Sequence, residues 1–315
     1  MIKEKQLEWR NDMNILVIDV GGTFIKYAWM NENAQILDKG KVSTPLDCLD
    51  SFLDVIETLW NLKKADGIAL SMPGMIDGER GFMYTGGALE YIQKLEMVSI
   101  LQKHFPVPIS LQNDAKCAAL AEVWKGNLSD CENGVVLVCG TGIGGAIVYN
   151  REVIRGEHFM AGEFSFIQTV MDDVDFDLDC SAGRQCGAKS LTKLVADSYG
   201  VSVEEAEKNY TGEILFKRAE EGEQQAIRAI RLLARRLAIL IHNLQFIFDP
   251  QKFLIGGGIS IQPLLLTLVK DELKKIREND MEGLPFPEIE VCKFYNDANL
   301  LGALYWWEKQ QKDSY

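Results

Sequence analysis

The sequence predicts an α/β protein built from two similar domains, and three observations support this prediction. The first is length, because 315 residues are enough for two domains with separate hydrophobic cores. The second is a repeated pattern at residues 14–29 and 135–148, in which a short apolar run enters a glycine-containing turn and a second apolar run leaves it. Short apolar runs bounded by glycine are typical of buried strands. The third is the alternation of further strand-like and helix-like segments, which is typical of α/β folds.

Composition and charge restrict the classes to which the protein can belong. The apolar and charged fractions, 47% and 25%, are those of an ordinary globular protein, and the formal charge of −13 argues against nucleic acid and anionic membranes as partners. The seven cysteines are odd in number, and Cys117 and Cys139 lie in apolar runs, which suits a reducing compartment better than a disulfide framework. No apolar run approaches the roughly 18 residues of a membrane span, and residues 1–12 lack the apolar core of a signal peptide. We therefore expect a cytoplasmic protein without a membrane partner.

The two glycine turns are candidates for phosphate binding. Glycine permits positive φ and a close approach of ligand to backbone, and successive N–H groups form a concave anion site. The first repeat adds Asp19 at the end of its entering strand and Lys26 just after the turn. An ordinary glycine hairpin is the alternative for each turn taken alone. Neither turn leads into a helix, as a dinucleotide-binding turn does, and neither ends in the Gly-Lys-Ser/Thr of a P-loop, so the pair favours a two-lobed phosphotransferase.

Between the two repeats, strand-like and helix-like segments alternate. The apolar spacing predicts strands at 35–42, 66–72 and 107–111 and helices at 50–62, 95–104 and 115–124. Residues 78–88 are rich in glycine and irregular, so that they form either a substrate-binding loop or a plain connector. Asn113 and Asp114 lie at a strand end before a helix, where they either cap the helix or face a ligand at the edge of the sheet.

The second half of the chain predicts longer helices and a third glycine turn. Residues 223–248 carry an apolar stripe at helical spacing. A strand-like run then enters Gly256, Gly257 and Gly258, and a helix follows from 263 to 279. A glycine turn that opens onto a helix N-terminus suits a nucleotide. Residues 171–179 contain five aspartates without the glycine and terminal glutamate of a calcium loop, so we expect a solvated loop there.

A series of motifs in this order resembles the ROK family of sugar kinases and related repressors. The motifs are Asp19-Val20-Gly21-Gly22-Thr23 with Lys26, Ser71-Met72-Pro73-Gly74, Asn113-Asp114-Ala115 with Ala121-Glu122, Gly140-Thr141-Gly142-Ile143-Gly144-Gly145, Gly162-Glu163, Gly256-Gly257-Gly258-Ile259, and Asp297-Ala298-Asn299-Leu300-Leu301-Gly302-Ala303. The resemblance implies a two-lobed, actin-like and ribonuclease H-like ATPase fold, with ATP and sugar in the interdomain cleft. It implies an N-terminal α/β lobe at 13–117 plus 300–315 and a C-terminal α/β lobe at 118–299.

The resemblance also implies roles for individual residues. Asp114 matches the catalytic aspartate that accepts the proton of the sugar hydroxyl, and Asn113 orients the ring. Glu163 matches a glutamate that contacts sugar hydroxyls, and Gly74 and Gly87 are expected near the substrate. Asp19 lies where such kinases hold an acid near Mg²⁺ and the phosphates of ATP. The residues expected at ATP are Asp19, Gly21, Gly22, Thr23, Lys26, Thr141, Gly142, Gly256, Gly257 and Gly258.

The sequence departs from the family where many members bind a structural zinc ion. Phe166 stands at the histidine position, and the cysteine run retains only Cys180 and Cys186, whereas structural zinc takes four ligands. We therefore expect no structural zinc and a loop at 171–189 that is held by packing against Phe164 and Phe166. A family glutamate that contacts the sugar falls at Lys189. The repressors carry DNA-binding helices before the first strand, where this sequence has only about a dozen residues, too few for two helices.

Together these features predict a sugar kinase that uses ATP and Mg²⁺. Because Phe166 makes the anomeric side of the pocket more apolar, and because residues 85–88, 161–164 and 248–250 are similar to β-glucoside kinases, we expect transfer to the 6-hydroxyl of a β-glucoside such as cellobiose. The alternative acceptors are those of a glucokinase or an N-acetylmannosamine kinase. The alternative of another class is a sugar-sensing regulator without catalysis. The expected ligands are sugar and ATP, with no nucleic acid, and we expect a homodimer because ROK kinases are commonly dimers.

Overall fold

The computed structural model describes residues 13–170, 178–278 and 285–313. The chain folds into two compact units, Met1–Leu120 with Asn299–Tyr315 (unit 1) and Ala121–Ala298 (unit 2). The chain passes between the units within helix α3 (Asp114–Lys125) and again at the start of helix α10 (Ala298–Asp313).

Unit 1 contains a five-stranded sheet in the order β3-β2-β1-β4-β8. The strands are β1 (Ile15–Val20), β2 (Phe24–Met30), β3 (Ile36–Ser43), β4 (Gly67–Met72) and β8 (Ile109–Asn113). Strands β1, β2 and β3 are antiparallel neighbours, whereas β1, β4 and β8 run parallel. The carboxyl ends of the three parallel strands therefore share one edge of the sheet, where Asp19 pairs in register with Lys26 on one side and with Ser71 on the other.

A small antiparallel sheet follows β4 in unit 1 and corrects the prediction of an irregular segment at 78–88. Its strands are β5 (Ile76–Asp77), β6 (Phe82–Thr85) and β7 (Gln93–Leu95). Met83 on β6 pairs with Ile76 and Leu95, and its side chain is fully buried in the core of unit 1. The glycines around this short strand concealed it because no run of alternating residues is long enough to show a strand.

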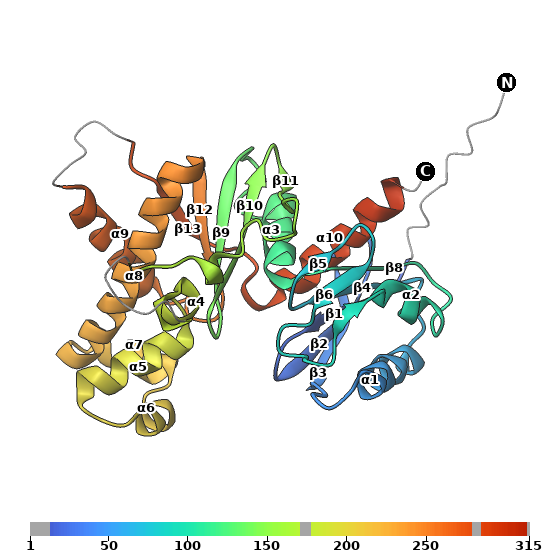
Figure 1. The fold of residues 1–315 in the computed structure, drawn as a ribbon, viewed down its shortest axis with the longest axis horizontal. Helices are drawn as coiled ribbons and strands as arrows, with labels where there is room; N and C mark the ends of the chain where they lie inside the picture. The colour runs from blue at the N-terminus through green and yellow to red at the C-terminus, as the bar shows by residue number, and fades with distance from the viewer. Residues whose placement is uncertain (1–12, 171–177, 279–284, 314–315) are drawn as a thin grey trace. The chain divides into compact units, whose positions relative to one another are not determined.

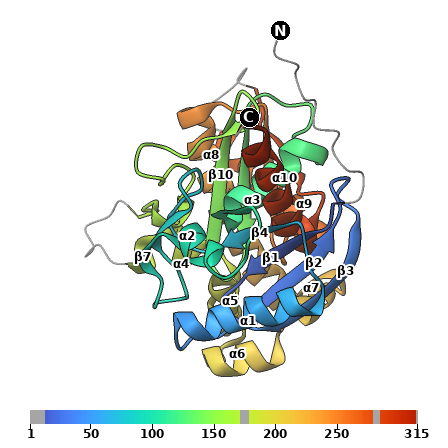
Figure 2. The ribbon, with the colours of Figure 1, turned by 90° about the vertical axis from the view of Figure 1, so that its right-hand side faces the viewer.

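The helices of unit 1 pack by the faces that their sequences predict. Figure 2 shows helix α1 (Leu49–Leu62) beside the sheet of unit 1. Its side chains Phe52, Ile56 and Leu59 are buried in the core of this unit, and α2 (Met97–Gln102) is shorter than the predicted 95–104. Helix α10 approaches α3 so closely that a Cβ on Gly302 would lie 1.7 Å from the carbonyl oxygen of Cys117. The Trp307 indole N–H donates to the carbonyl oxygen of Pro108 at 3.1 Å, which fixes α10 beside β8.

Unit 2 repeats the plan of unit 1, with a five-stranded sheet in the order β11-β10-β9-β12-β13 (Figure 1). The strands are β9 (Gly134–Cys139), β10 (Ile143–Tyr149), β11 (Glu152–Val153), β12 (Lys252–Gly256) and β13 (Glu288–Val291). Strands β9, β10 and β11 are again antiparallel neighbours, and β9, β12 and β13 run parallel. The prediction that one domain plan occurs twice is confirmed by this match in strand order and direction.

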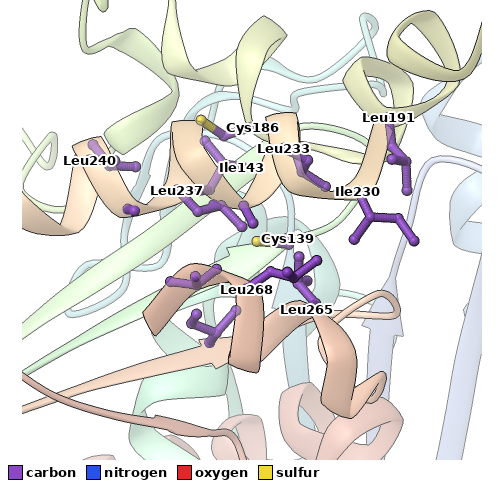
Figure 3. Packing of buried hydrophobic residues seen from close by; sticks show 14 of the residues in the cluster. Cys139, Ile143, Cys186, Leu191, Ile230, Leu233, Leu237, Leu240, Leu265 and Leu268 are labelled. Atoms are coloured by element: carbon purple, nitrogen blue, oxygen red, sulfur yellow. The ribbon is translucent and has the colours of Figure 1, made fainter. Parts of the chain in front are cut away.

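The core of unit 2 is dominated by helix α8 (Gln224–Phe248), which contains the predicted apolar stripe, and by α9 (Pro263–Arg277). Figure 3 shows Leu233 and Leu237 of α8 and Leu265 and Leu268 of α9 around Cys139, the last residue of β9. Four further helices precede α8 in this unit: α4 (Ala182–Gln185), α5 (Ala188–Tyr199), α6 (Val203–Asn209) and α7 (Gly212–Glu220). Over the described ranges of the chain, no helix is both long enough and apolar enough to cross a membrane.

Candidate functional site

Asp19 stands at the carboxyl end of β1 with its carboxylate held from several sides. Its Oδ1 accepts a hydrogen bond from Ser71 Oγ at 3.0 Å and another from Asn299 Nδ2 at 2.9 Å, and its Oδ2 lies 3.5 Å from Lys26 Nζ. Asp19 is 5% exposed, so this charged group is buried with its partners in place. Ser71 and Asn299 lie within motifs that resemble the ROK family, but no role for either residue follows from the sequence alone.

Asn113 serves as the N-cap of α3 and also binds the loop that follows β4. Its Oδ1 accepts from the backbone N–H of Lys116 at 3.1 Å, which is the usual capping bond to the third helical residue. Its Nδ2 donates to the carbonyl oxygen of Gly74 at 3.0 Å. The capping interpretation is therefore confirmed for Asn113.

Asp114 follows at the first position of α3 and is the most strongly perturbed carboxyl group at this edge of the sheet. Burial and, to a smaller extent, the negative charge of Asp19 raise its pKa to about 6, while hydrogen bonds from the N–H of Ala115, 2.8 Å from Oδ1, and from the Asn113 side chain act in the opposite direction. A carboxylate with a pKa near 6 is ionised at neutral pH and still basic enough to accept a proton in a transition state. Asp114 is therefore the candidate general base at this strand edge.

Two loops of unit 1 pack closely near Asn113, and each contains a glycine with positive φ. Gly74 has φ +103°, and a Cβ there would lie 2.1 Å from the carbonyl oxygen of Thr85. Gly87 has φ +59°, and its Cβ would meet the Pro73 side chain at 3.0 Å. Glycine is thus required at both positions because the loop after β4, which contains Gly74, packs against the loop after β6, which contains Gly87. The structure brings both predicted substrate-binding glycines to the same strand edge as Asn113.

The first glycine turn differs from its prediction in conformation. Neither Gly21 nor Gly22 has positive φ, and the N–H of Gly21 donates to the carbonyl oxygen of Phe24 at 3.0 Å, so it faces into the turn. Thr44, the residue after β3, stabilises the turn because its hydroxyl donates a hydrogen bond to the carbonyl oxygen of Gly21 at 2.7 Å. Gly22 and Thr23 remain exposed. The positive φ expected here is wrong because the tight β1–β2 connection closes within the ordinary region of the backbone.

In unit 2, the second and third glycine turns adjoin each other. Gly140 and Gly142 likewise lack positive φ, whereas Gly257 has φ +90°, and a Cβ at Gly257 would lie 2.1 Å from the carbonyl oxygen of Cys139. This close approach places the β12–α9 turn directly against the end of β9. Gly258 has no neighbour within 4 Å of its Cβ position, so its space is open. Unit 2 therefore presents two turns with accessible backbone at one edge of its sheet.

A cavity of about 280 Å³ opens beside the second turn. Its lining consists of Thr141, Gly142, Ile143, Ser165, Phe166, Ser181, Gly183, Arg184 and Lys189. The N–H of Lys189 donates to the carbonyl oxygen of Thr141 at 3.2 Å, which joins the start of α5 to the turn. Lys189, the position of a family glutamate, thus lies at this cavity.

Glu163 and the two phenylalanines after it lie along β10, at a short helical turn (Phe164–Phe166). Gly162 has φ +82°, and its Cβ would lie 2.8 Å from the Cα of Ala146, so glycine is needed to seat Glu163 beside the strand. Phe164 is buried, but Phe166 is 62% exposed. Phe166 lines the cavity together with Ser181 and Gly183 of the 171–189 segment, and the expectation that both rings hold this segment stays a prediction.

The degenerate cysteine run is partly described. Cys186 is buried next to Cys139, and Cys180 is half-buried. Burial raises the pKa of the Cys186 thiol to about 12. No three His, Cys, Asp or Glu side chains gather as metal ligands within 13–170, 178–278 and 285–313. Residues 171–177 of the acidic loop lie outside the described residues.

Comparison with known proteins extends over nearly the whole chain. A family model described as the ROK family matches residues 15–310. A beta-glucoside kinase from Klebsiella pneumoniae is 32% identical over 294 residues, which cover 93% of this chain and 95% of that protein. A beta-glucoside kinase from Listeria monocytogenes is 29% identical over 294 residues, covering 93% and 97%.

The fold is also that of solved relatives. The crystal structure of a ROK family protein from Streptococcus pneumoniae in complex with sucrose matches with a TM-score of 0.84 and 30% identity, covering 96% of this chain and 100% of that one. The match confirms the predicted actin-like fold, and the family model confirms the resemblance first noted in the motifs. The chain therefore belongs to the ROK family and is one of its sugar kinases.

Proposed function

We propose that the protein transfers the γ-phosphoryl group of ATP to the 6-hydroxyl of a β-glucoside such as cellobiose, with Asp114 as general base. The observation that carries this proposal is the carboxyl group of Asp114, which combines a pKa of about 6 with a position at the strand edge beside Asp19. A sugar hydroxyl is a weak nucleophile at neutral pH, so a base at the oxygen and charge stabilisation at the phosphoryl group are the two requirements of the reaction.

The step is an in-line displacement. The sugar oxygen forms a bond to the γ-phosphorus, the bond from that phosphorus to the bridging oxygen breaks, ADP leaves, and the hydroxyl proton passes to the Asp114 carboxylate. Asn113 would orient the ring through its side-chain amide. Glu163 would contact further hydroxyls, and Gly74 and Gly87 would hold the loops beside the acceptor.

The nucleotide would use backbone groups and one carboxylate. In this proposal the phosphates are bound by the first two glycine turns, at Gly21, Gly22, Thr23, Thr141 and Gly142. The adenosine is flanked by the third turn, at Gly256, Gly257 and Gly258. Carboxylate oxygen is a preferred ligand of Mg²⁺, and Asp19 with its ordered partners fits that role, while Lys26 adds positive charge. Mg²⁺ bound with ATP supplies neutralisation of the phosphate charge.

The acceptor is inferred from Phe166 and from the relatives. The exposed ring of Phe166 lines the cavity beside Thr141 and Gly142, and an aromatic face suits the C–H face of a second sugar ring. The Klebsiella and Listeria relatives are beta-glucoside kinases, and the Streptococcus structure holds sucrose, a disaccharide. A homodimer, common among ROK kinases, is the proposed assembly.

The deciding measurement is kcat/KM for cellobiose against glucose and N-acetylmannosamine, with ³¹P NMR to identify the phosphorylated oxygen. We expect cellobiose to be preferred and its 6-hydroxyl to be phosphorylated. A tenfold preference for a monosaccharide, about 1.4 kcal/mol in transition-state binding, would overturn the β-glucoside assignment and leave the kinase. Absence of ADP release with any sugar would favour the sensing protein instead.

A matched pair of variants separates the contribution of Phe166 from that of exposed aromatic rings in general. Phe166→His should lower kcat/KM for cellobiose more than for glucose. Phe286→His removes another exposed phenylalanine of unit 2, 48% exposed and stacked near Arg277, and should leave the ratio unchanged.

A further inference from the structure

A second cavity in unit 2 lies between helices α8 and α9 and contains none of the residues assigned to the kinase reaction. It has a volume of about 590 Å³, within the range of small-molecule sites. Its lining consists of Gln224, Ile227, Arg228, Arg231, Leu232 and Arg235 of α8 and Glu272, Lys275 and Ile276 of α9. Four cations and one carboxylate thus line a groove in a chain whose formal charge is −13. We call this cavity the α8–α9 groove.

Only part of the positive charge is neutralised inside the groove. Glu272 is 4% exposed, and its Oε1 accepts from Arg231 Nη1 at 3.0 Å and from Lys275 Nζ at 2.7 Å. Arg228 and Arg235 form no hydrogen bond or ion pair with the residues that the structure describes. Glu272 therefore holds the side chains of Arg231 and Lys275 in place. The guanidinium groups of Arg228 and Arg235 remain available to a ligand.

The two available arginines stand on one face of α8, two turns apart. A spacing of seven residues corresponds to about 10 Å along a helix. Leu232 lies between them and is 37% exposed, and Ile276 adds apolar surface from α9. The opposite face of α8, with Ile230, Leu233 and Leu237, is buried in the core that Figure 3 shows, so the helix that carries the arginines is firmly anchored.

We propose that the α8–α9 groove binds an organic phosphate, either a sugar phosphate or a nucleotide. Arginine offers paired N–H donors that match phosphate oxygens, and its charge does not titrate at neutral pH. The groove holds these donors beside an apolar wall, which fits a ligand with a phosphate group and a ring rather than inorganic phosphate. This site is separate from the glycine turns and does not depend on the identity of the acceptor sugar.

Isothermal titration of the full-length protein with glucose 6-phosphate, AMP and inorganic phosphate tests the proposal. The variant Arg228→Gln with Arg235→Gln should weaken binding of the favoured organic phosphate at least tenfold. The control Lys270→Gln with Lys274→Gln removes the same charge from exposed positions of α9 outside the groove and should leave that affinity unchanged. Tighter binding of glucose 6-phosphate assigns a sugar phosphate, and tighter binding of AMP a nucleotide.

Four results would overturn the assignment. The first is an unchanged affinity in the double arginine variant, because any observed binding then belongs elsewhere, including the kinase site. The second is inorganic phosphate binding as tightly as both organic phosphates, and the third is no binding of any probe. The fourth is a changed sedimentation mass of the arginine variant with its phosphate affinity intact, which would assign the arginines to subunit contact.

Discussion

Asp19 and Asn299 stand 280 positions apart in the sequence and are joined by a hydrogen bond of 2.9 Å from Asn299 Nδ2 to Asp19 Oδ1. The bond connects the end of β1 to the first turn of α10, the last helix of the chain. Together with the bond from Ser71, it occupies Oδ1 and leaves Oδ2 on the side of Lys26. The position of the carboxylate in unit 1 thus depends on the C-terminal helix.

Replacement of Asn299 tests this dependence. Asn299→Ala removes a donor to a buried carboxylate, which should lower the free energy of unfolding by about 1.5–3 kcal/mol and raise KM for Mg²⁺–ATP. Urea unfolding and initial rates measure the two effects. Asn243→Ala, at an exposed position of α8, is the control and should change stability by less than about 0.5 kcal/mol. Stability of Asn299→Ala within that margin would contradict the role of the bond.

Removal of the general base should separate chemistry from binding. Asp114→Asn keeps the shape of the side chain, so we expect the fold and the affinity for ATP to persist while kcat falls roughly 10²–10⁴-fold. Single-turnover kinetics and nucleotide titration measure the two quantities. A folded Asp114→Asn variant with near wild-type turnover would remove Asp114 from the mechanism.

The raised pKa of Asp114 also predicts a change in stability with pH. Because the folded-state pKa is about 6 and the unfolded value is 3.8, the folded state holds more protons between these values, so the stability contribution of this group declines as pH rises through that window and is lost above about pH 6. Asp114→Asn should therefore raise stability at pH 7.5, by up to about 3 kcal/mol, and the gain should nearly vanish by pH 4. Thermal unfolding of both proteins between pH 4 and pH 7.5 measures this difference in stability. An equal gain in stability at both pH values would contradict the prediction.

In the wild type, kcat/KM should decline below about pH 6 as the carboxylate of Asp114 becomes protonated.

The third glycine turn offers a matched pair of substitutions. Gly257→Ala would place a Cβ 2.1 Å from the Cys139 carbonyl at φ +90°, so it should destabilise unit 2 by several kcal/mol, about 1–3 of which come from the backbone conformation. Gly258→Ala adds the same methyl group to open space and should be nearly neutral. Equal melting temperatures for the two variants would show that the turn rearranges.

The cysteine run predicts behaviour toward chelators. With only Cys180 and Cys186 and a buried Cys186 thiol, we expect no stoichiometric zinc and no change of Tm after incubation with EDTA. Elemental analysis of the purified protein is the direct measurement. About one zinc ion per chain, together with a lower Tm after chelation, would refute this expectation.

The elements that depend on local sequence patterns could be predicted from the sequence. The residue roles that depend on contacts between distant parts of the chain could not. Strand–turn–strand units, the long apolar helix α8 and the position of Asn113 before α3 follow from spacing and composition within a few neighbouring residues. The function of Gly74 follows from the carbonyl of Thr85, which no local pattern contains. The same holds for Ser71 and Asn299, whose side chains matter because folding brings them to Asp19.

The error at the glycine turns has a physical cause as well. The glycines predict positive φ, whereas Gly142 is required by a close approach, since a Cβ there would meet the carbonyl oxygen of Gly183 at 2.7 Å. Phe164 and Phe166 are equally apolar, and only the turn of the helix between them decides which ring is buried against Gly145. Composition alone does not distinguish these cases.

The glycine turns of unit 2 have a consequence for how ligand binding would respond to acidity. At the position in β9 that corresponds to Asp19 in β1, the chain has Val138, and the neighbouring residue of β12 is Gly256 rather than Ser71. Thr141, Gly142 and Gly257 carry no group that gains or loses a proton near neutrality. A change in acidity would therefore leave these three residues uncharged, so their contacts to a nucleotide would add no protonation step to the pH dependence of the reaction.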